Sequence, residues 1–403
     1  MSGTTPYNRC FASLSLTGRH GLAGRLALAA LALLAAACGK IETWEGDPVP
    51  VAFSTYARQS TKADASYVAP GANFAAGAQI GVFGFYHDGN GATDGSWAAD
   101  QAAGNNIPDY MYNQLVTKQD DGSWTYSPIK YWPNETGAGA TSEHADKLSF
   151  WGYYPRIAEA NYTADAAMYT GTDAVLRFWK AGSTTEPYAN DVSGLPRVTF
   201  TQSADPDKMV DLMFAAPQQD LTKPSLDGKV QFVFRHALAL VEFQLAEGTG
   251  AKLNTLDLTN IKKSGTVEDP GTVPFVWSGV DDSSEYTTHI EDLDVHEATL
   301  LRLLAVPQTL NDNATFTLNY DITFESSDPT HPDPIVYKGD SFSVKLFDNT
   351  NADPSKRYGV TKWEAGKHYI YKISAGLDRI EFEEIVDSPD DWSIGNNNIS
   401  VPE

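Results

Sequence analysis

A cysteine at position 38 has the type and setting of a residue that is chemically modified. It follows Ala35-Ala36-Ala37, and a charge-free apolar run that begins at Leu26 leads up to it. Small residues after a short apolar stretch are typical of a secretory signal, and a cysteine directly behind them is typical of a lipoprotein whose thiol takes up acyl chains such as palmitate. The run is too short to span a bilayer, and a buried N-terminal helix would use such a sequence poorly. We expect residues 1–37 to be a removed lipoprotein signal peptide and Cys38 to be lipidated.

Arg58 and Lys62 lie in a second stretch where chemistry can be expected. The sequence from Ala57 to Gly77 has no sustained hydrophobic period and is rich in Ser, Thr, Asp, Pro and Gly, which indicates an exposed loop. Exposed loops are preferred sites of proteolysis. Both residues therefore qualify as positions of cleavage, although ordinary solvated charges would give the same pattern.

The remaining polar motifs do not form a recognisable catalytic or metal site. Asp88–Asp94 suggests a calcium loop, but Ala92 and Thr93 occupy positions where the EF-hand pattern requires Asp or Asn and Gly. The histidines show no metal-ligand spacing, and His236 in its apolar run is expected to be structural: His87, His144, His236 and His368. Paired carboxylates could serve a glycosidase, but in an acidic chain they are expected on solvated faces: Asp281-Asp282, Glu383-Glu384 and Asp390-Asp391.

Aromatic residues are dense in two parts of the first half of the chain. They could stack on sugars or peptides, or they could fill a core, and the latter interpretation is favoured. The residues are Trp124, Tyr126, Tyr131, Trp132, Trp151, Tyr153 and Tyr154.

Charge and cysteine content exclude several classes of function. The chain carries a formal net charge of −23. Removal of residues 1–37 would take away three arginines and no acidic residue, so the remaining chain would be still more negative. Nucleic acid is therefore an unsuitable partner, and a membrane would be reached through the lipid on Cys38 rather than through a basic patch. The other cysteine, Cys10, lies in the expected signal peptide, so the exported chain would have no disulfide.

The elements around these residues are expected to be strands. Residues 38–48 are polar and suit a tether, and Val49–Tyr56 alternates with an apolar side formed by Val49, Val51 and Phe53. Pro50 lacks an N–H group, which favours an edge position in the sheet. An edge strand can leave without breaking ladders on both of its sides.

Period-2 alternation continues through the chain. Met111–Thr117 and Trp124–Trp132 are expected to form a hairpin around Asp121-Gly122, whereas Asp207–Phe214 fits one helical turn or a strand equally well. Further strands are expected at Ile80–Tyr86, Lys147–Tyr154, Ala237–Leu245, Thr315–Phe324, Phe342–Leu346, Lys367–Ala375 and Arg379–Val386. Polar and turn-forming residues at Gln218–Lys229 indicate a domain boundary. These patterns predict an all-β chain with two tandem β-sandwich domains, 49–222 and 223–403.

Several segments together resemble the fimbrillin family, the type V pilins and pilin-like lipoproteins of Bacteroidales. The segments are Ile80–Phe83, Tyr126–Pro133, Leu148–Pro155, Asp211–Met213, Phe234–Leu238 and Trp363–Tyr369. The resemblance implies two transthyretin-like β-sandwich domains and export to the outer membrane and cell surface as a lipoprotein. It also implies cleavage after the first strand by a trypsin-like protease, at Arg58 as the first choice and Lys62 as the second, and polymerisation with other pilin subunits by strand exchange.

This resemblance leaves alternatives open. The last stretch, Arg379–Ile394, could donate a strand to a neighbouring subunit or could be the final strand of its own sheet, and the latter is favoured. The chain is expected to be a structural fimbrial subunit without cofactor or metal. The alternatives are a surface lipoprotein or tip adhesin that binds glycan or host protein without polymerising, and, more remotely, a secreted carbohydrate-active enzyme.

Overall fold

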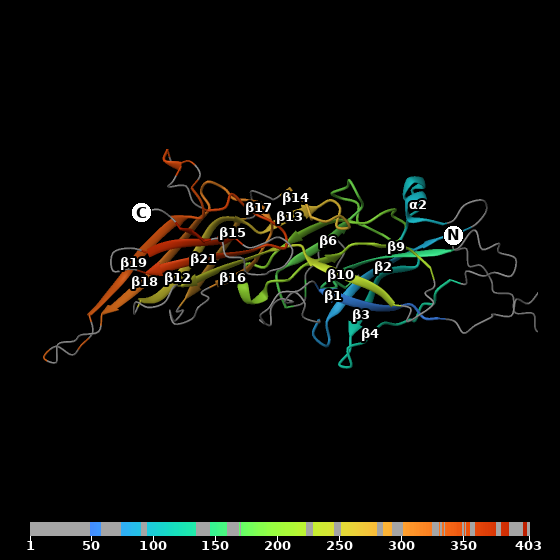
Figure 1. Cartoon of the computed structure of the whole chain (residues 1–403), viewed down its shortest axis with the longest axis horizontal. Helices are drawn as coiled ribbons and strands as arrows, with labels where there is room; N and C mark the ends of the chain where they lie inside the picture. Colours follow the sequence, from blue (N-terminus) through green and yellow to red (C-terminus); the bar gives the residue numbers. More distant parts are fainter. Residues whose placement is uncertain are drawn as a thin grey trace, which may run out of the picture. The chain divides into compact units, whose positions relative to one another are not determined.

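The structure is a computed structural model of the whole chain. It describes residues 49–57, 74–89, 95–133, 146–158, 169, 171–222, 229–245, 251–279, 285–291, 301–324, 330, 333, 335–348, 350, 352–354, 359–375, 380–386 and 398–400. The described part is almost entirely β-structure, which confirms the predicted fold class (Figure 1).

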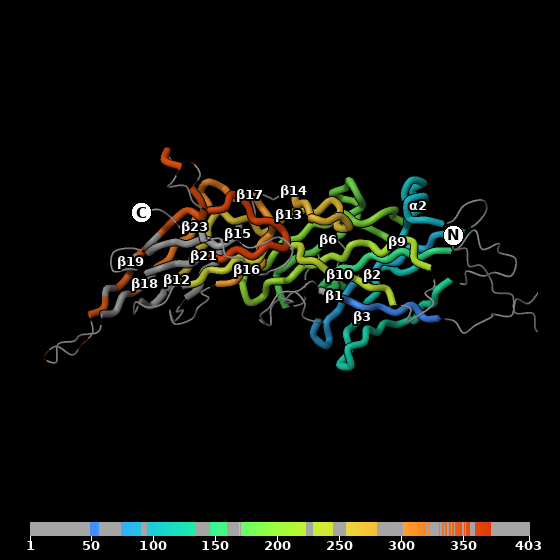
Figure 2. Tube along the Cα trace, viewed as in Figure 1, coloured from blue at the N-terminus to red at the C-terminus, as the bar shows by residue number. Residues whose placement is uncertain are grey.

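The largest sheet has eight strands in the order β1-β10-β8-β5-β2-β3-β4, with β9 also paired to β5. All neighbours are antiparallel except β1 and β10, which run parallel and lie side by side in Figure 2. The bounds are β1 Ala52–Ala57, β2 Gln79–His87, β3 Met111–Lys118, β4 Trp124–Thr125, β5 Lys147–Tyr154, β8 Met213–Ala215, β9 Gln218–Leu221 and β10 Lys229–His236.

Strand β5 shows why this sheet has a core on each face. Phe150 lies in one buried cluster, with Phe232 of β10, while Trp151 lies in the other, with Phe83 of β2. Successive side chains of a strand point to opposite faces, so a strand covered on both sides reads as an almost continuous apolar run. This explains the sequence Leu148–Tyr154, because both faces of the strand are buried.

A second sheet packs against the face of the large sheet that carries Trp151. Its order is β14-β13-β7-β6, and Phe178 of β6 contacts Tyr153 edge to face, with ring centroids 4.8 Å apart. The bounds are β6 Val175–Trp179, β7 Arg197–Thr201, β13 Ser264–Val267 and β14 Trp277–Ser278.

Two further sheets enclose the core of the second half. Their orders are β16-β11-β21-β22-β23 and β15-β12-β18-β19, and Phe243 of β11 stacks on Phe316 of β18 with centroids 5.1 Å apart. The bounds are β11 Ala239–Leu245, β12 Ala251–Lys262, β15 Glu285–Glu291, β16 Leu301–Ala305, β18 Thr315–Phe324, β19 Ile335–Lys345, β21 His368–Ala375, β22 Ile380–Val386 and β23 Asn398–Ser400. The strands predicted in this half are thus confirmed, with β19 longer than expected.

The remaining elements are short. Strands β17 (Gln308–Thr309) and β20 (Lys362–Trp363) form a two-stranded sheet. Helix α2 (Trp97–Ala103) begins after Ser96, whose hydroxyl accepts the Ala99 N–H, and ends at Gly104 in the left-handed region with φ of 74°. A single 3₁₀ turn, η2 (Pro206–Lys208), precedes β8, so the ambiguous Asp207–Phe214 segment contains both a turn and the start of a strand.

Strands on both sides of residue 222 share sheets. Strand β10 lies between β1 and β8, and β13 pairs with β7. The division into domains 49–222 and 223–403 stays a prediction.

One predicted strand is much shorter in the structure. The hairpin around Asp121-Gly122 forms, but β4 covers only Trp124–Thr125 of the predicted Trp124–Trp132. Pro128 has no N–H group to continue the ladder, and the chain beyond it contacts the segment before β1 instead.

Candidate functional site

Strand β1 occupies the edge position that the sequence predicted. Ala52–Ala57 pairs with Lys229–Phe234 of β10, and the strand order of the sheet begins with β1. Just before the strand, the Val51 N–H donates to the Lys130 carbonyl at 2.8 Å, and the Val49 carbonyl accepts the Trp132 N–H at 3.0 Å. Residues 49–51 are therefore hydrogen-bonded to residues 130–132, and residues 52–57 are paired with β10.

The inward side chains of this segment complete an aromatic cluster. Val51 and Phe53 are 1% and 3% exposed. The Phe53 ring stacks on Phe232 at 5.7 Å and meets Phe150 edge to face at 5.7 Å. Burial of two such side chains contributes about 3 to 6 kcal/mol. Removal of the segment would expose a groove floored by aromatic rings.

Tyr126 closes the other side of this groove. Its hydroxyl donates to the Val51 carbonyl at 2.7 Å, and its ring lies 5.5 Å from that of Phe53. Burial raises the pKa of the Tyr126 phenol, so the hydroxyl remains a proton donor. With β1 removed, this groove would therefore offer a backbone edge on β10, an apolar floor and a hydrogen-bond donor.

The chain returns to the same cluster after the predicted loop. Phe74 is 3% exposed and contacts Phe234 and Tyr154, with ring centroids 5.3 and 4.9 Å away. The stretch between β1 and Phe74 contains the predicted cleavage residues, but Cys38, Arg58 and Lys62 lie outside the described residues.

Segments that carried the family resemblance meet in pairs. His236 Nδ1 lies 2.8 Å from Asp211 Oδ1, and both residues are buried. The Gly366 N–H donates to the Leu238 carbonyl at 2.8 Å. His236 is thus a structural histidine, as the sequence predicted.

A buried ion pair lies where β11, β16 and β21 adjoin. Glu242 is 4% exposed, and its carboxylate contacts Arg302 Nε at 2.5 Å and His368 Nε2 at 3.4 Å. Burial by itself raises the pKa of Glu242, but the hydrogen bonds and charges of His368 and Arg302 outweigh it and lower the pKa to about 2. The carboxylate is ionised and fixed, which is a structural arrangement.

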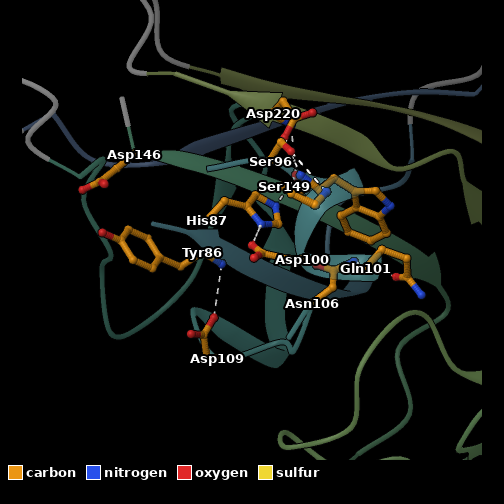
Figure 3. A network of polar contacts seen from close by, with 12 residues as sticks. Tyr86, His87, Ser96, Asp100, Gln101, Asn106, Asp109, Asp146, Ser149 and Asp220 are labelled. Carbon is orange, nitrogen blue, oxygen red and sulfur yellow. Dashed lines mark hydrogen bonds and ion pairs between the residues drawn. The ribbon is translucent and has the colours of Figure 1, made fainter. Parts of the chain in front are cut away.

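An Asp-His-Ser chain links helix α2 to the large sheet (Figure 3). His87 Nδ1 lies 2.6 Å from Asp100 Oδ2, and His87 Nε2 lies 2.7 Å from Ser149 Oγ. This connectivity is that of a catalytic triad. However, Ser149 is fully buried, and its Oγ also accepts the Asp220 N–H at 3.0 Å. A substrate carbonyl has no access to this hydroxyl, so the chain serves to fix elements.

The elements so fixed include a tryptophan that the sequence analysis did not single out. The backbone N–H of Trp97 donates to Asp220 Oδ1 at 2.7 Å. The Trp97 ring meets that of Phe85 edge to face, with centroids 4.9 Å apart. Trp97 begins a helix of seven residues, too short for its hydrophobic period to be recognised against the surrounding loops.

Five of the seven aromatic residues predicted to fill the core are buried, while Tyr154 is partly buried against the core and Tyr131 is exposed. Trp124, Tyr126, Trp132, Trp151 and Tyr153 are at most 9% exposed, whereas Tyr131 is 49% exposed. The preferred interpretation of these rings is confirmed, and they offer little surface for stacking a ligand.

The last predicted strand lies within a sheet of the chain itself. β22 pairs with β21 on one side and with β23 on the other. This is the interpretation that the sequence analysis favoured for Arg379–Val386, and the continuation to Ile394 lies outside the described residues.

Two negative findings apply to the described part of the chain. It contains no group of three or more His, Cys, Asp or Glu side chains that could hold a metal ion. None of its helices has the length and apolarity needed to cross a membrane.

Comparison with known proteins agrees with this geometry. Residues 61–386 match the fimbrillin-like family, and the chain belongs to this family. It is therefore a pilus-related protein, which implies a location at the cell surface. No curated protein sequence matches the chain.

The chain is similar to solved structures of fimbrial proteins, and the first of them shares its fold. A fimbrial protein from Bacteroides vulgatus is 17% identical, with 85% of this chain and 99% of that chain covered and a TM-score of 0.51. A fimbrial assembly protein from Parabacteroides distasonis is 10% identical, covering 84% and 97%, with a TM-score of 0.31. The tip fimbrial protein Mfa3 from Porphyromonas gingivalis is 13% identical, covering 79% and 95%, with a TM-score of 0.33.

Proposed function

We propose that this chain is a structural fimbrial subunit that assembles by exchanging its first strand. The observation that carries the proposal is the position of β1 at a sheet edge. There Val51 and Phe53 complete an apolar cluster whose other members belong to the rest of the chain. A strand from another subunit, with apolar residues at alternate positions, would bury the same rings and pair with β10. Such a strand would replace both the lost apolar contacts and the lost ladder.

The order of segments supports a maturation route. Cys38 would carry the lipid that anchors the exported precursor to the outer membrane. A trypsin-like protease would then cut after Arg58 or Lys62, between β1 and the buried Phe74. After that cut only non-covalent contacts would hold β1, whereas Phe74 would keep the remainder of the chain in the cluster.

The proposed role is structural and does not include catalysis. The Asp100-His87-Ser149 chain has no access for a substrate, and the buried Glu242 carboxylate is paired with Arg302 and His368. The polymer partners would be other pilin subunits, of the same or another kind. The alternative, a surface lipoprotein or tip adhesin that does not polymerise, predicts a chain that stays monomeric after the same cut.

The test is limited trypsin treatment of the purified precursor. We expect a new N-terminus at Gln59 or Ala63, followed by multimers that resist detergent. The double variant Arg58→Ala/Lys62→Ala should stay uncut there and monomeric, while Lys180→Ala, which changes an exposed lysine elsewhere, should behave like the wild type. A cut chain that remains monomeric would favour the adhesin, and native fibres that retain an uncut N-terminus would refute the proposal.

Lipidation is tested separately by metabolic labelling with radioactive palmitate. The wild-type chain should incorporate label, and Cys38→Ser should not. The variant Cys10→Ser is the matched control and should be labelled like the wild type. Label that persists in Cys38→Ser would place the lipid elsewhere.

A further inference from the structure

A pocket of about 440 Å³ lies beside helix α2, away from the β1 groove. It is lined by α2, by the loop before β7, by the link between β8 and β9, by β9 itself and by the turn between β13 and β14. Its size is that of a site for a small ligand. The lining residues that bear on its chemistry are Trp97, Gln101, Ser193, Gln219, Glu268 and Asp269.

Trp97 supplies a fixed aromatic surface in this lining. The Phe85 and His87 rings meet it edge to face, at 4.9 and 6.2 Å. The His87 ring is held in turn by Asp100 and Ser149, as Figure 3 shows. The triad-like chain thus positions the indole, so little conformational entropy remains to be lost when a ligand stacks on it.

The loop that carries Ser193 and Gly194 is also preorganised. The Gly194 N–H donates to the Asn106 carbonyl at 2.8 Å, and the Asn106 amide donates to Gln101 Oε1 at 3.0 Å. Gly194 has a φ of 85°, which a residue with a side chain rarely adopts. The loop that carries Ser193 is therefore fastened to the helix that carries Trp97.

The polar groups of the lining include an unused hydrogen-bonding group. Ser193 Oγ is shielded from solvent and has no hydrogen-bond partner among the described residues. A buried hydroxyl without a partner costs free energy, and rotation of the Ser193 side chain toward the pocket would let a ligand group recover it.

Two carboxylates supply acceptors at fixed positions. Arg197 Nε donates to both carboxylate oxygens of Glu268, at 2.9 and 3.0 Å. Asp269 accepts bonds from the Gly271 N–H and the Thr272 hydroxyl. Both carboxylates keep lone pairs available for further donors.

The charge of the lining selects among ligand classes. None of the described lining residues is Lys, Arg or His, so an anionic ligand such as a phosphate or an acidic sugar would meet the Asp269 carboxylate and a Glu268 carboxylate whose partner Arg197 is already engaged. A purely cationic ligand would use the carboxylates and the indole, but it would leave the Ser193 hydroxyl and the Gln219 amide without a suitable partner. A neutral polyol offers donors and acceptors together, and a sugar ring adds an apolar face that fits an indole.

We propose that this pocket binds a neutral sugar residue of a glycan, with its apolar face on Trp97 and its hydroxyls on Ser193, Glu268 and Asp269. This activity goes beyond the structural role proposed above. It does not require the loss of β1, and it can be measured on the uncut monomer, so failure of one proposal leaves the other standing.

The test uses the purified, uncut protein on an array of neutral oligosaccharides and of sialylated and sulfated ones. The best neutral ligand, as its methyl glycoside, is then titrated by calorimetry. We expect binding to neutral glycans, a loss of about tenfold or more in affinity for Trp97→Ala and a smaller loss for Ser193→Ala. Quenching or shift of tryptophan fluorescence should accompany binding and vanish in Trp97→Ala.

Matched controls separate the pocket from general effects on folding. Tyr131→Ala removes an exposed aromatic ring outside the pocket and should bind like the wild type. Trp97→Phe should keep part of the affinity, because an aromatic face remains, and melting temperatures should show that each variant is folded. Absence of binding to every neutral glycan would overturn the proposal. Binding of neutral glycans that survives in folded Trp97→Ala would also overturn it. Preferential binding of acidic glycans, or of a cationic ligand such as Nα-acetyl-lysine amide, would overturn it as well.

Discussion

At the scale of single residues, Glu242 makes the stability of this protein depend on pH. Its pKa is lowered from an ordinary 4.5 to about 2 in the fold. A carboxyl group whose pKa is lowered by folding stabilises the fold at pH values above its unfolded pKa. This stabilisation is lost as the pH falls through the folded pKa, so the change in stability is expected between about pH 4.5 and 2. The shift corresponds to about 3 kcal/mol.

We therefore predict that Glu242→Gln flattens the acid limb of the stability curve. At pH 7 the variant should unfold about 1 to 3 kcal/mol more easily than the wild type, because Arg302 and His368 lose their charged partner. Below about pH 2.5 the unfolding free energies of the two proteins should converge. Urea unfolding followed across pH measures both effects, and a constant difference between the proteins at every pH would contradict the assignment.

Tyr153 provides a second test at this scale. Its hydroxyl donates to Asn113 Oδ1 at 2.8 Å and accepts the Ile157 N–H at 3.1 Å, and both partners are buried. Tyr153→Phe would leave buried polar groups without this bond, so we expect a loss of about 1 to 3 kcal/mol in unfolding free energy. Tyr131→Phe, on an exposed ring, should change it by less than about 0.5 kcal/mol. Equal effects in the two variants would show that the bond is unimportant.

At the scale of elements, β1 is retained by the buried side chains on one of its two faces. Phe53→Ala should lower the unfolding free energy of the uncut protein by about 3 to 5 kcal/mol, because a fully buried ring is lost from the cluster with Phe150 and Phe232. Ser54→Ala, on the opposite face of the same strand, should have an effect below about 0.5 kcal/mol. A similar effect of both changes would mean that the cluster does not retain β1.

Helix α2 depends on its first turn and on the network beneath it. The Ser96 hydroxyl accepts the Ala99 N–H at 3.2 Å, so Ser96→Ala should cost about 1 kcal/mol, and Ser96→Asp should restore most of that loss. Hydrogen exchange of the α2 amides, compared with those of β2, measures the local effect. Unchanged protection of α2 in Ser96→Ala would show that the network alone fixes the helix.

At the scale of the whole molecule, strands from both sides of residue 222 share sheets. A fragment that ends at residue 222 lacks β10, which leaves β1 without its ladder partner and β7 without β13. We predict that neither residues 38–222 nor residues 223–403 unfold cooperatively alone, and that coexpressed fragments associate. Calorimetry and gel filtration test this, and a sharp independent transition of the first fragment would place a complete domain before residue 222.

The sequence by itself indicated part of the strands and which of their side chains are buried, but it did not single out β6, β7, β10, β12, β15 or β16. Alternation at Val51 and Phe53, the doubly apolar run at Leu148–Tyr154 and the edge position implied by Pro50 are local patterns, set by side-chain direction and by a missing N–H group. The structural role of His236 was also readable, because a histidine in an apolar run needs a buried partner.

Only the tertiary structure decided which segments come together. The parallel pairing of β1 with β10, the sharing of a sheet by β7 and β13, and the pocket formed around Trp97 all join residues that are far apart in the chain. Alternation fixes which face of a strand is buried, but it carries no information about the neighbouring strand. For the same reason the Asp100-His87-Ser149 chain was not visible in the sequence, because its geometry arises from the pairing of β2 with β5 and the packing of a short helix over both.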